Sequence, residues 1–180
     1  MTTLNAKSII ENTLSTLHKR IDNYDGTLLV QRTNGYLGEC RFQFHEPANQ
    51  IDFNHFEEQT NWCLPSGVRA FYEIHNGASL FMQENAVQFD ILSLNGIVNN
   101  YWDFIPEHWY PVASHCDGDT LLVDSNLVKQ GQNNCLIWFE CGGTLEHAIH
   151  LPIPFEVWFD RFIISQGDHF WLWGTHRFYE

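Results

Sequence analysis

The feature that most constrains the fold is a series of short strand-like runs joined by tight turns. Asp117-Gly118 separates two such runs within 109–126, and Gly142-Gly143 joins two runs of matching length within 135–151. Asn34-Gly35 lies between two earlier runs. Tight turns link antiparallel neighbours, whereas parallel strands need a crossover of about a dozen residues or more. The pattern therefore predicts a mainly antiparallel sheet built from hairpins.

Apolar residues recur at spacings of three and four in 10–21, 68–75 and 155–163, which predicts three amphipathic helices. Proline and serine at 65–66 are suited to begin the second helix, and Asn76-Gly77 is suited to end it. Helices that flank an antiparallel sheet indicate the α+β class.

The remaining segments are less regular. We expect 46–62 to be a loop with one helical turn near His55, and 97–109 to contain a short helix that ends at Pro106. Val87, Phe89 and Ile91 alternate with mostly polar residues, as in a strand with one apolar face.

The chain length fits a single domain over 1–180. Within it, 4–45 would form an N-terminal helix and hairpin. The tail, 168–180, is so aromatic that we expect it to pack back on the body, because its exposure would promote association.

Net charge excludes several classes of partner. The 180 residues include 9 Lys plus Arg and 22 Asp plus Glu, a formal charge of -13 with neutral histidines. From Ala70 to Asp160, Lys129 is the only basic residue, against twelve acids. Such a surface repels nucleic acid and anionic membranes. It either keeps the protein dispersed or attracts a basic protein partner.

The number and spacing of the cysteines and the lengths of the apolar runs indicate where in the cell the protein lies. The five cysteines are odd in number and include no CxxC pair, which suits reduced thiols in a cytoplasm. The apolar runs are far shorter than the ~20 residues that cross a bilayer. We therefore expect a cytoplasmic protein without membrane contact.

The sequence shows no pattern typical of catalysis, metal binding or cofactor binding. HExxH, GxSxG and the glycine-rich phosphate loops are missing. The densest group of potential ligands lies in 115–120, where Leu121, Leu122 and Val123 occupy steps at which a calcium loop needs oxygen ligands. We expect a plain hairpin turn there, and no catalytic residue, cofactor or metal site in the chain.

Three segments, in order, resemble the SUKH superfamily (Smi/Knr-like), whose members include bacterial immunity proteins and fungal cell-wall regulators. "LPSGVRAFYEIHNGASLF" is similar to its Leu-Pro, helix, Asn-Gly motif, "YPVASHCDGDTLLVD" to its strand with a Gly-Asp turn, and "FEVWFDRFI" to its closing helix. The likeness covers about 62–166. It implies a SUKH-like α+β domain and scaffold roles for the matching residues, namely Leu64, Pro65, Phe71, Asn76, Gly77, Gly118 and Asp119.

The resemblance also implies a non-enzymatic bacterial immunity protein that neutralises a toxin domain with a basic surface, such as a nuclease. The alternatives are a regulatory or scaffolding module and a metal-dependent hydrolase. We expect a monomer or weak homodimer. We expect the contact surface to include the acids of the hairpin region, namely Asp117, Asp119, Asp124, Glu140 and Glu146. Trp102 and Trp109 would be either anchors of this contact or core residues.

Overall fold

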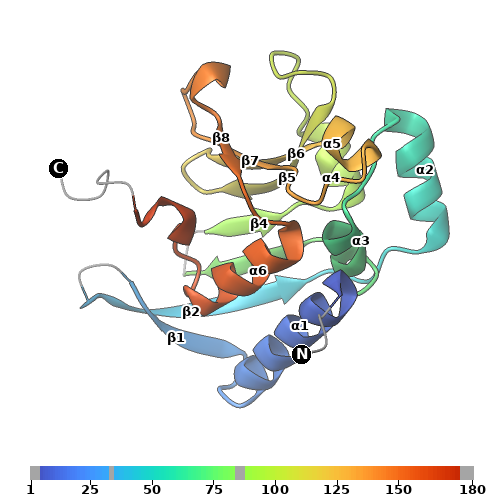
Figure 1. Cartoon of the computed structure of the whole chain (residues 1–180). Helices are drawn as coiled ribbons and strands as arrows, with labels where there is room; N and C mark the ends of the chain where they lie inside the picture. The colour runs from blue at the N-terminus through green and yellow to red at the C-terminus, as the bar shows by residue number, and fades with distance from the viewer. Residues whose placement is uncertain (1–4, 33–34, 84–87, 175–180) are drawn as a thin grey trace.

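The computed structural model describes residues 5–32, 35–83 and 88–174. Over this part the chain forms a single α+β domain in which helices flank an eight-stranded antiparallel sheet (Figure 1). The strands are β1 Thr27–Gln31, β2 Leu37–Phe44, β3 Ala78–Met82, β4 Phe89–Ile91, β5 Trp109–His115, β6 Thr120–Asp124, β7 Leu136–Phe139 and β8 Ile149–Leu151. The helices are α1 Ala6–Asp22, α2 Gln50–Thr60, α3 Ser66–Tyr72, α4 Leu94–Asn99, α5 Ser125–Lys129 and α6 Phe155–Ile164, with short 3-10 helices η2 Leu145–His147 and η3 Phe170–Leu172.

The sheet is a meander, since its spatial order β1 to β8 is also the order of the strands in the chain. Every neighbouring pair is antiparallel. The antiparallel α+β fold predicted from the turn dipeptides is confirmed. Gly118, between β5 and β6, has φ +92°, a conformation that glycine adopts without steric cost.

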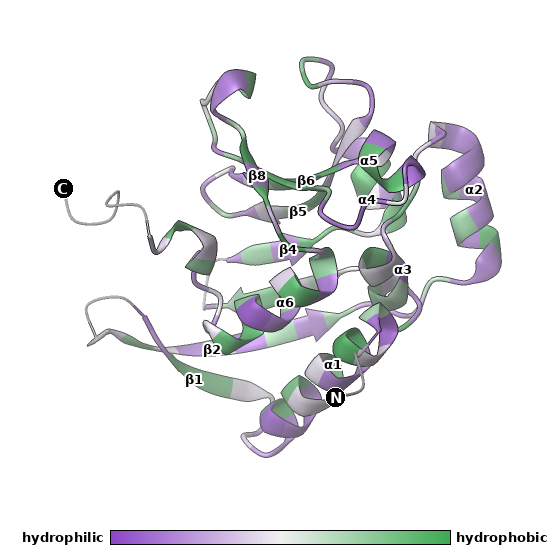
Figure 2. Cartoon of the chain, in the orientation of Figure 1, coloured by the Kyte–Doolittle hydropathy of each residue, from purple (hydrophilic) through white to green (hydrophobic). Residues whose placement is uncertain are grey.

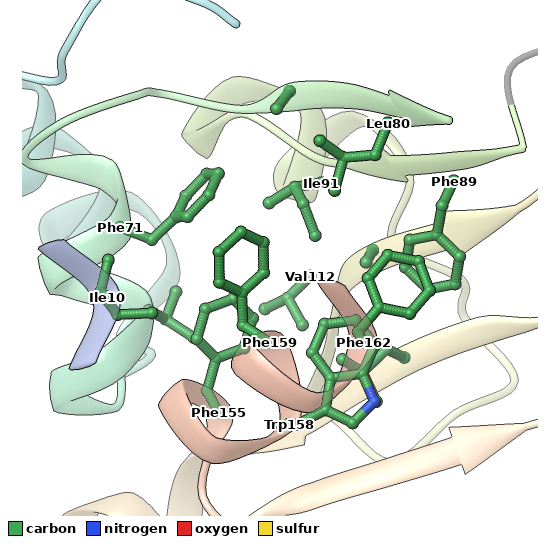
Figure 3. Close-up of a cluster of buried hydrophobic side chains, with 14 of the residues drawn as sticks. Ile10, Phe71, Leu80, Phe89, Ile91, Val112, Phe155, Trp158, Phe159 and Phe162 are labelled. Carbon is green, nitrogen blue, oxygen red and sulfur yellow. The ribbon is translucent and has the colours of Figure 1, made fainter. Parts of the chain in front are cut away.

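The main core lies between one face of the sheet and the helices α1, α3 and α6 (Figure 1). Its centre consists of aromatic rings of α6 that face aliphatic and aromatic side chains of β3, β4 and β5 (Figure 3). The periodicity of α1 and α6 is confirmed, because the predicted apolar stripes are buried: Ile10, Leu14, Leu17 and Ile21 in α1, and Phe155, Phe159, Phe162 and Ile163 in α6.

A second, smaller core covers the other face of β5, β6 and β7, which we call the outer face. It consists of Ile105, Trp109, Leu122, Ile137 and Phe139. These strands are therefore buried on both faces, which explains why they read as nearly continuous apolar runs.

Two expectations for irregular segments were wrong. Residues 50–60 form the helix α2 instead of a loop with one turn, because Asn49 and Asp52 make a reciprocal capping box at its start. Figure 2 shows α2 as hydrophilic along most of its length, so its sequence has little apolar periodicity. The short helix expected in 97–109 begins and ends earlier, as α4, because Ser93 caps its first turn.

The described part of the aromatic tail packs on the body through Trp171, whereas Trp173 is 62% exposed. The Trp171 ring lies 4.8 Å from Trp138 and 5.5 Å from Trp158, between ring centroids. The expectations for Asn34, Val87 and 175–180 lie outside the described residues. No helix among the described residues is both long enough and apolar enough to span a bilayer.

Candidate docking surface

Segments 100–108 and 140–148 contribute to the outer side of the sheet beside the β5–β6 turn. Ile105 from the first segment and Ala148 from the second both pack against the second core. The Asp119 carboxylate accepts a hydrogen bond from the backbone N–H of Cys141 over 2.8 Å, which joins the turn to the second segment. Chain segments that are distant in sequence therefore form one edge of the molecule.

An aromatic cluster occupies this edge. The rings of Trp102 and Phe104 stack with centroids 5.5 Å apart and an interplanar angle of 7°. Both rings lie close to Phe139 of β7, at 6.4 and 6.0 Å. Phe139 is buried, whereas Phe104 is 61% exposed. Phe104 thus presents a large apolar face to solvent, on a rigid stack of aromatic rings.

Acidic side chains occur in the same segments as the aromatic cluster and in the β5–β6 turn. Asp103 is exposed between the two stacked aromatic residues. Asp117 and Glu146 are exposed, Asp119 is half-buried in the β5–β6 turn, and Glu140 is half-buried directly after Phe139. We call these acids together with Trp102 and Phe104 the acidic–aromatic surface.

Asp124 and Trp109 are both buried, so neither is available for the contact surface in which we expected them. The Trp109 indole N–H donates to the Asp124 carboxylate over 3.2 Å. The same carboxylate accepts from the backbone N–H groups of Asn126 and Leu127, and so caps α5. Asp124 is therefore a structural helix cap. Trp109 is a core residue, which was one of the two roles expected for it.

The β5–β6 turn has a distinctive electrostatic environment. Burial lowers the pKa of His115 below its ordinary value, against the opposing effect of Asp117 and Asp119. Burial and the neighbouring Asp117 raise the pKa of the Cys116 thiol. At neutral pH the turn therefore carries a neutral imidazole, a protonated thiol and two carboxylates. His115, Cys116 and Asp117 also form the one group in the described part of the chain with donor atoms close enough for a metal ion.

The residues expected to be scaffold lie in structural positions. Pro65 precedes α3, Leu64 packs on the main core and Phe71 is fully buried. The Asn76 side chain accepts from the backbone N–H of Leu94, and Gly77 has φ +100°. A Cβ on Gly118 would lie 2.9 Å from Cys141 Sγ, so glycine is needed for space there as well.

Two residues with clear roles were not singled out from the sequence. Phe104 is the most exposed aromatic side chain of the surface. Its position next to Asp103, in a segment without regular apolar spacing, was the sequence feature that could have indicated its exposure. Glu156 is buried at the start of α6, where its backbone and side chain leave no room for a Cβ on Gly67. Gly67 and Glu156 are 89 positions apart in the chain, and no sequence pattern predicts a contact between two such residues.

The fold and the acidic–aromatic surface define a single-domain α+β protein built on an antiparallel meander. A family model described as SMI1 / KNR4 family (SUKH-1) matches residues 47–161. The chain therefore belongs to the SMI1/KNR4 (SUKH-1) family, and the resemblance read from its sequence is confirmed.

Two proteins of Bacillus subtilis (strain 168) are similar to the chain. Uncharacterized protein YnaB is 30% identical over 137 residues, which cover 75% of this chain and 90% of the relative. Uncharacterized protein YobM is 27% identical over 175 residues, which cover 92% of each chain. Family membership supports a toxin-immunity type of role in general terms.

Proposed function

We propose that this protein is a non-enzymatic immunity protein that binds and neutralises a bacterial toxin domain with a basic surface, such as a nuclease, in the cytoplasm. The observation that carries the proposal is the acidic–aromatic surface, which combines exposed acidic residues with an exposed Phe104 ring stacked on Trp102. Family membership supplies the class of role, and the surface supplies the chemistry of the partner.

Charge complementarity favours a cationic partner. The net charge of -13 includes three exposed acids of this surface, Asp103, Asp117 and Glu146, and the half-buried Asp119. Opposite charge on a partner raises association rates by about 10 to 1,000-fold at low ionic strength. An inhibitor must occupy the toxin before damage occurs, so fast association is the property that such a surface supplies.

The aromatic residues would supply the affinity that charge alone does not. Interface hot spots are enriched in Trp and Tyr near the centre of a contact and are surrounded by polar rims. Phe104 stacked on Trp102 has this arrangement, with acids at its margin. We place the toxin contact over these two rings.

Association kinetics with the toxin domain encoded by the adjacent gene test the surface. We expect a variant with Asp103, Asp117 and Glu146 changed to lysine to associate at least about tenfold more slowly at low salt, with a weaker salt dependence. The matched control changes the exposed acids Glu11, Asp22 and Glu58 to lysine on α1 and α2, an equal change in net charge. Equal slowing in both variants would show that only net charge matters and would reject this surface as the contact.

Co-expression tests the function itself. Cells that express the adjacent toxin domain should survive only with this protein present, and the two chains should co-purify. Survival without complex formation, or a complex that does not protect, would contradict the proposal.

A further inference from the structure

The β5–β6 turn brings three different metal-ligand types together without any motif spacing. The donor atoms of His115, Cys116 and Asp117 all lie within 4.8 Å of one another. His115 Nδ1 is 3.3 Å from Asp117 Oδ2, and Cys116 Sγ is 3.7 Å from Asp117 Oδ1. Cys116 Sγ lies 3.9 Å from His115 Nδ1.

These separations match the edges of a tetrahedral coordination shell. Zinc binds nitrogen and oxygen at about 2.0–2.2 Å and thiolate sulfur at about 2.3 Å. Ligand atoms at those distances in a tetrahedron are separated by roughly 3.3 to 3.8 Å. The two distances to Asp117 involve different carboxylate oxygens, so an ion bound to one of them would draw donors that now lie within 4.8 Å together by on the order of an ångström.

The imidazole is held in place before any ion binds. The His115 side chain is 8% exposed. Its ring centroid lies 4.6 Å from that of His169 and 6.0 Å from that of Phe89. Nδ1 nevertheless faces the turn, since it is within 3.4 Å of the backbone nitrogen of Asp117. Nδ1 accepts a hydrogen bond from this N–H, and a bound ion would take the place of that bond.

A fourth donor lies against the same turn. A Cβ on Gly118 would be 2.9 Å from Cys141 Sγ, so this exposed thiol borders the residue that follows Asp117. We propose that the turn binds a borderline divalent transition ion, above all Zn²⁺, through His115, Cys116 and Asp117, with Cys141 or water in the fourth position.

Binding of the ion releases a proton. The ion binds the thiolate, so the Cys116 S–H bond breaks and its proton passes to solvent as the Zn–S bond forms.

Co²⁺ titration of the purified, chelator-treated full chain tests the site, because tetrahedral Co²⁺ with a thiolate ligand gives a near-ultraviolet sulfur-to-cobalt charge-transfer band. We expect one equivalent to bind and Zn²⁺ to abolish the band. Cys116→Ser should remove the band with water as the fourth ligand and weaken it with Cys141 as the fourth ligand. Asp117→Asn should weaken Co²⁺ binding at least about tenfold, since even outer partners of metal sites contribute that much. Both residues are exposed, so both variants should fold.

Cys141→Ser is the matched control, because Cys141 is an exposed thiol beside the same turn. A band of unchanged intensity in this variant assigns water to the fourth position, whereas a band weakened in both cysteine variants assigns Cys141, because one thiolate then remains in each. Lack of a band in the parent protein, or a band of unchanged intensity in Cys116→Ser, would overturn the site. The experiment contains no toxin, so its result is independent of the proposed immunity function.

Discussion

The side-chain carbonyl of Asn76 accepts a hydrogen bond from the backbone N–H of Leu94 over 3.0 Å. Asn76 follows α3 and Leu94 begins α4, so this single bond joins the turn after one helix to the first turn of another. It gives a physical reason for the Asn in the Asn-Gly pair by which the family resemblance was recognised.

We expect Asn76→Ala to lower the free energy of unfolding by about 1–3 kcal/mol, because it leaves the Leu94 N–H without this acceptor in a partly buried site. Asn76→Asp keeps an acceptor oxygen near the start of α4 and should retain most of the stability. Urea denaturation at pH 7 measures both. An equal loss in the two variants would show that the amide group, rather than this acceptor, is what matters.

Gly118 should tolerate a side chain less well than another glycine of similar conformation. Its φ is +92°, and a Cβ would meet Cys141 Sγ at 2.9 Å, whereas Gly131 has φ +75° and open space. We expect Gly131→Ala to cost about 1 kcal/mol from backbone strain alone, and Gly118→Ala about 1–3 kcal/mol. Adding Cys141→Ala to Gly118→Ala should recover the stability that Gly118→Ala loses beyond Gly131→Ala. Urea denaturation of the variants measures this recovery. No recovery would mean that the sulfur contact is not the cause.

The buried imidazole of His169 should make the protein sensitive to acid. Burial, with a contribution from His115, lowers the pKa of His169 from 6.5 to about 4. Between these values the unfolded chain binds more protons than the folded one, so the free energy of unfolding falls as the pH decreases. For this group alone the loss from pH 7 to pH 5 is on the order of 2 kcal/mol.

His169→Phe should remove this part of the acid sensitivity. Nε2 of His169 has no hydrogen-bond partner among the described residues, and its ring packs against Trp138 and Trp171, so Phe can replace it without losing a bond at that atom. His75 and His115, whose pKa values burial also lowers, keep a residual dependence in the variant. Parallel urea denaturations at pH 7 and pH 5 measure the change. Equal pH dependence in both proteins would contradict the lowered pKa.

Phe104→Ala should separate binding from stability. Phe104 is 61% exposed, so its truncation should change the free energy of unfolding by less than about 1 kcal/mol. Within the proposed function it should weaken toxin binding at least about tenfold, since it removes a central aromatic anchor. Ile164→Ala is the control, because Ile164 is 70% exposed at the end of α6 on the opposite face of the sheet. Titration calorimetry with the toxin domain measures both, and equal affinities would remove Phe104 from the contact.

The elements that could be predicted from the sequence are those whose apolar side chains recur at one regular helical spacing. The stripes of α1 and α6 face a single core, and the turns at Gly118 and Gly142 have the positive φ that glycine permits. Helix α2 was missed because it buries only Phe53 and Phe56 and exposes Ile51 at 77%. Its capping box, Asn49 with Asp52, was the available signal.

The candidate surface was predictable only in part. The charge run indicated an acidic surface, and of the two turn acids Asp117 is exposed and Asp119 is half-buried. Asp124 could not be distinguished from them, because its burial depends on Trp109 fifteen residues earlier and on the helix that follows. The proximity of His115, Cys116 and Asp117 likewise depends on side-chain directions at the end of a strand, which spacing alone does not give.

The two ends of the meander are joined through its helices, since the Thr13 hydroxyl donates to Asp160 over 2.8 Å and α1 packs along α6 (Figure 1). All eight strands precede α6 in the chain, so they leave the ribosome before α6 does. Until then the apolar side of the sheet has no aromatic layer to cover it. The main core therefore stays open during synthesis until α6 emerges, and this interval exposes apolar surface to association.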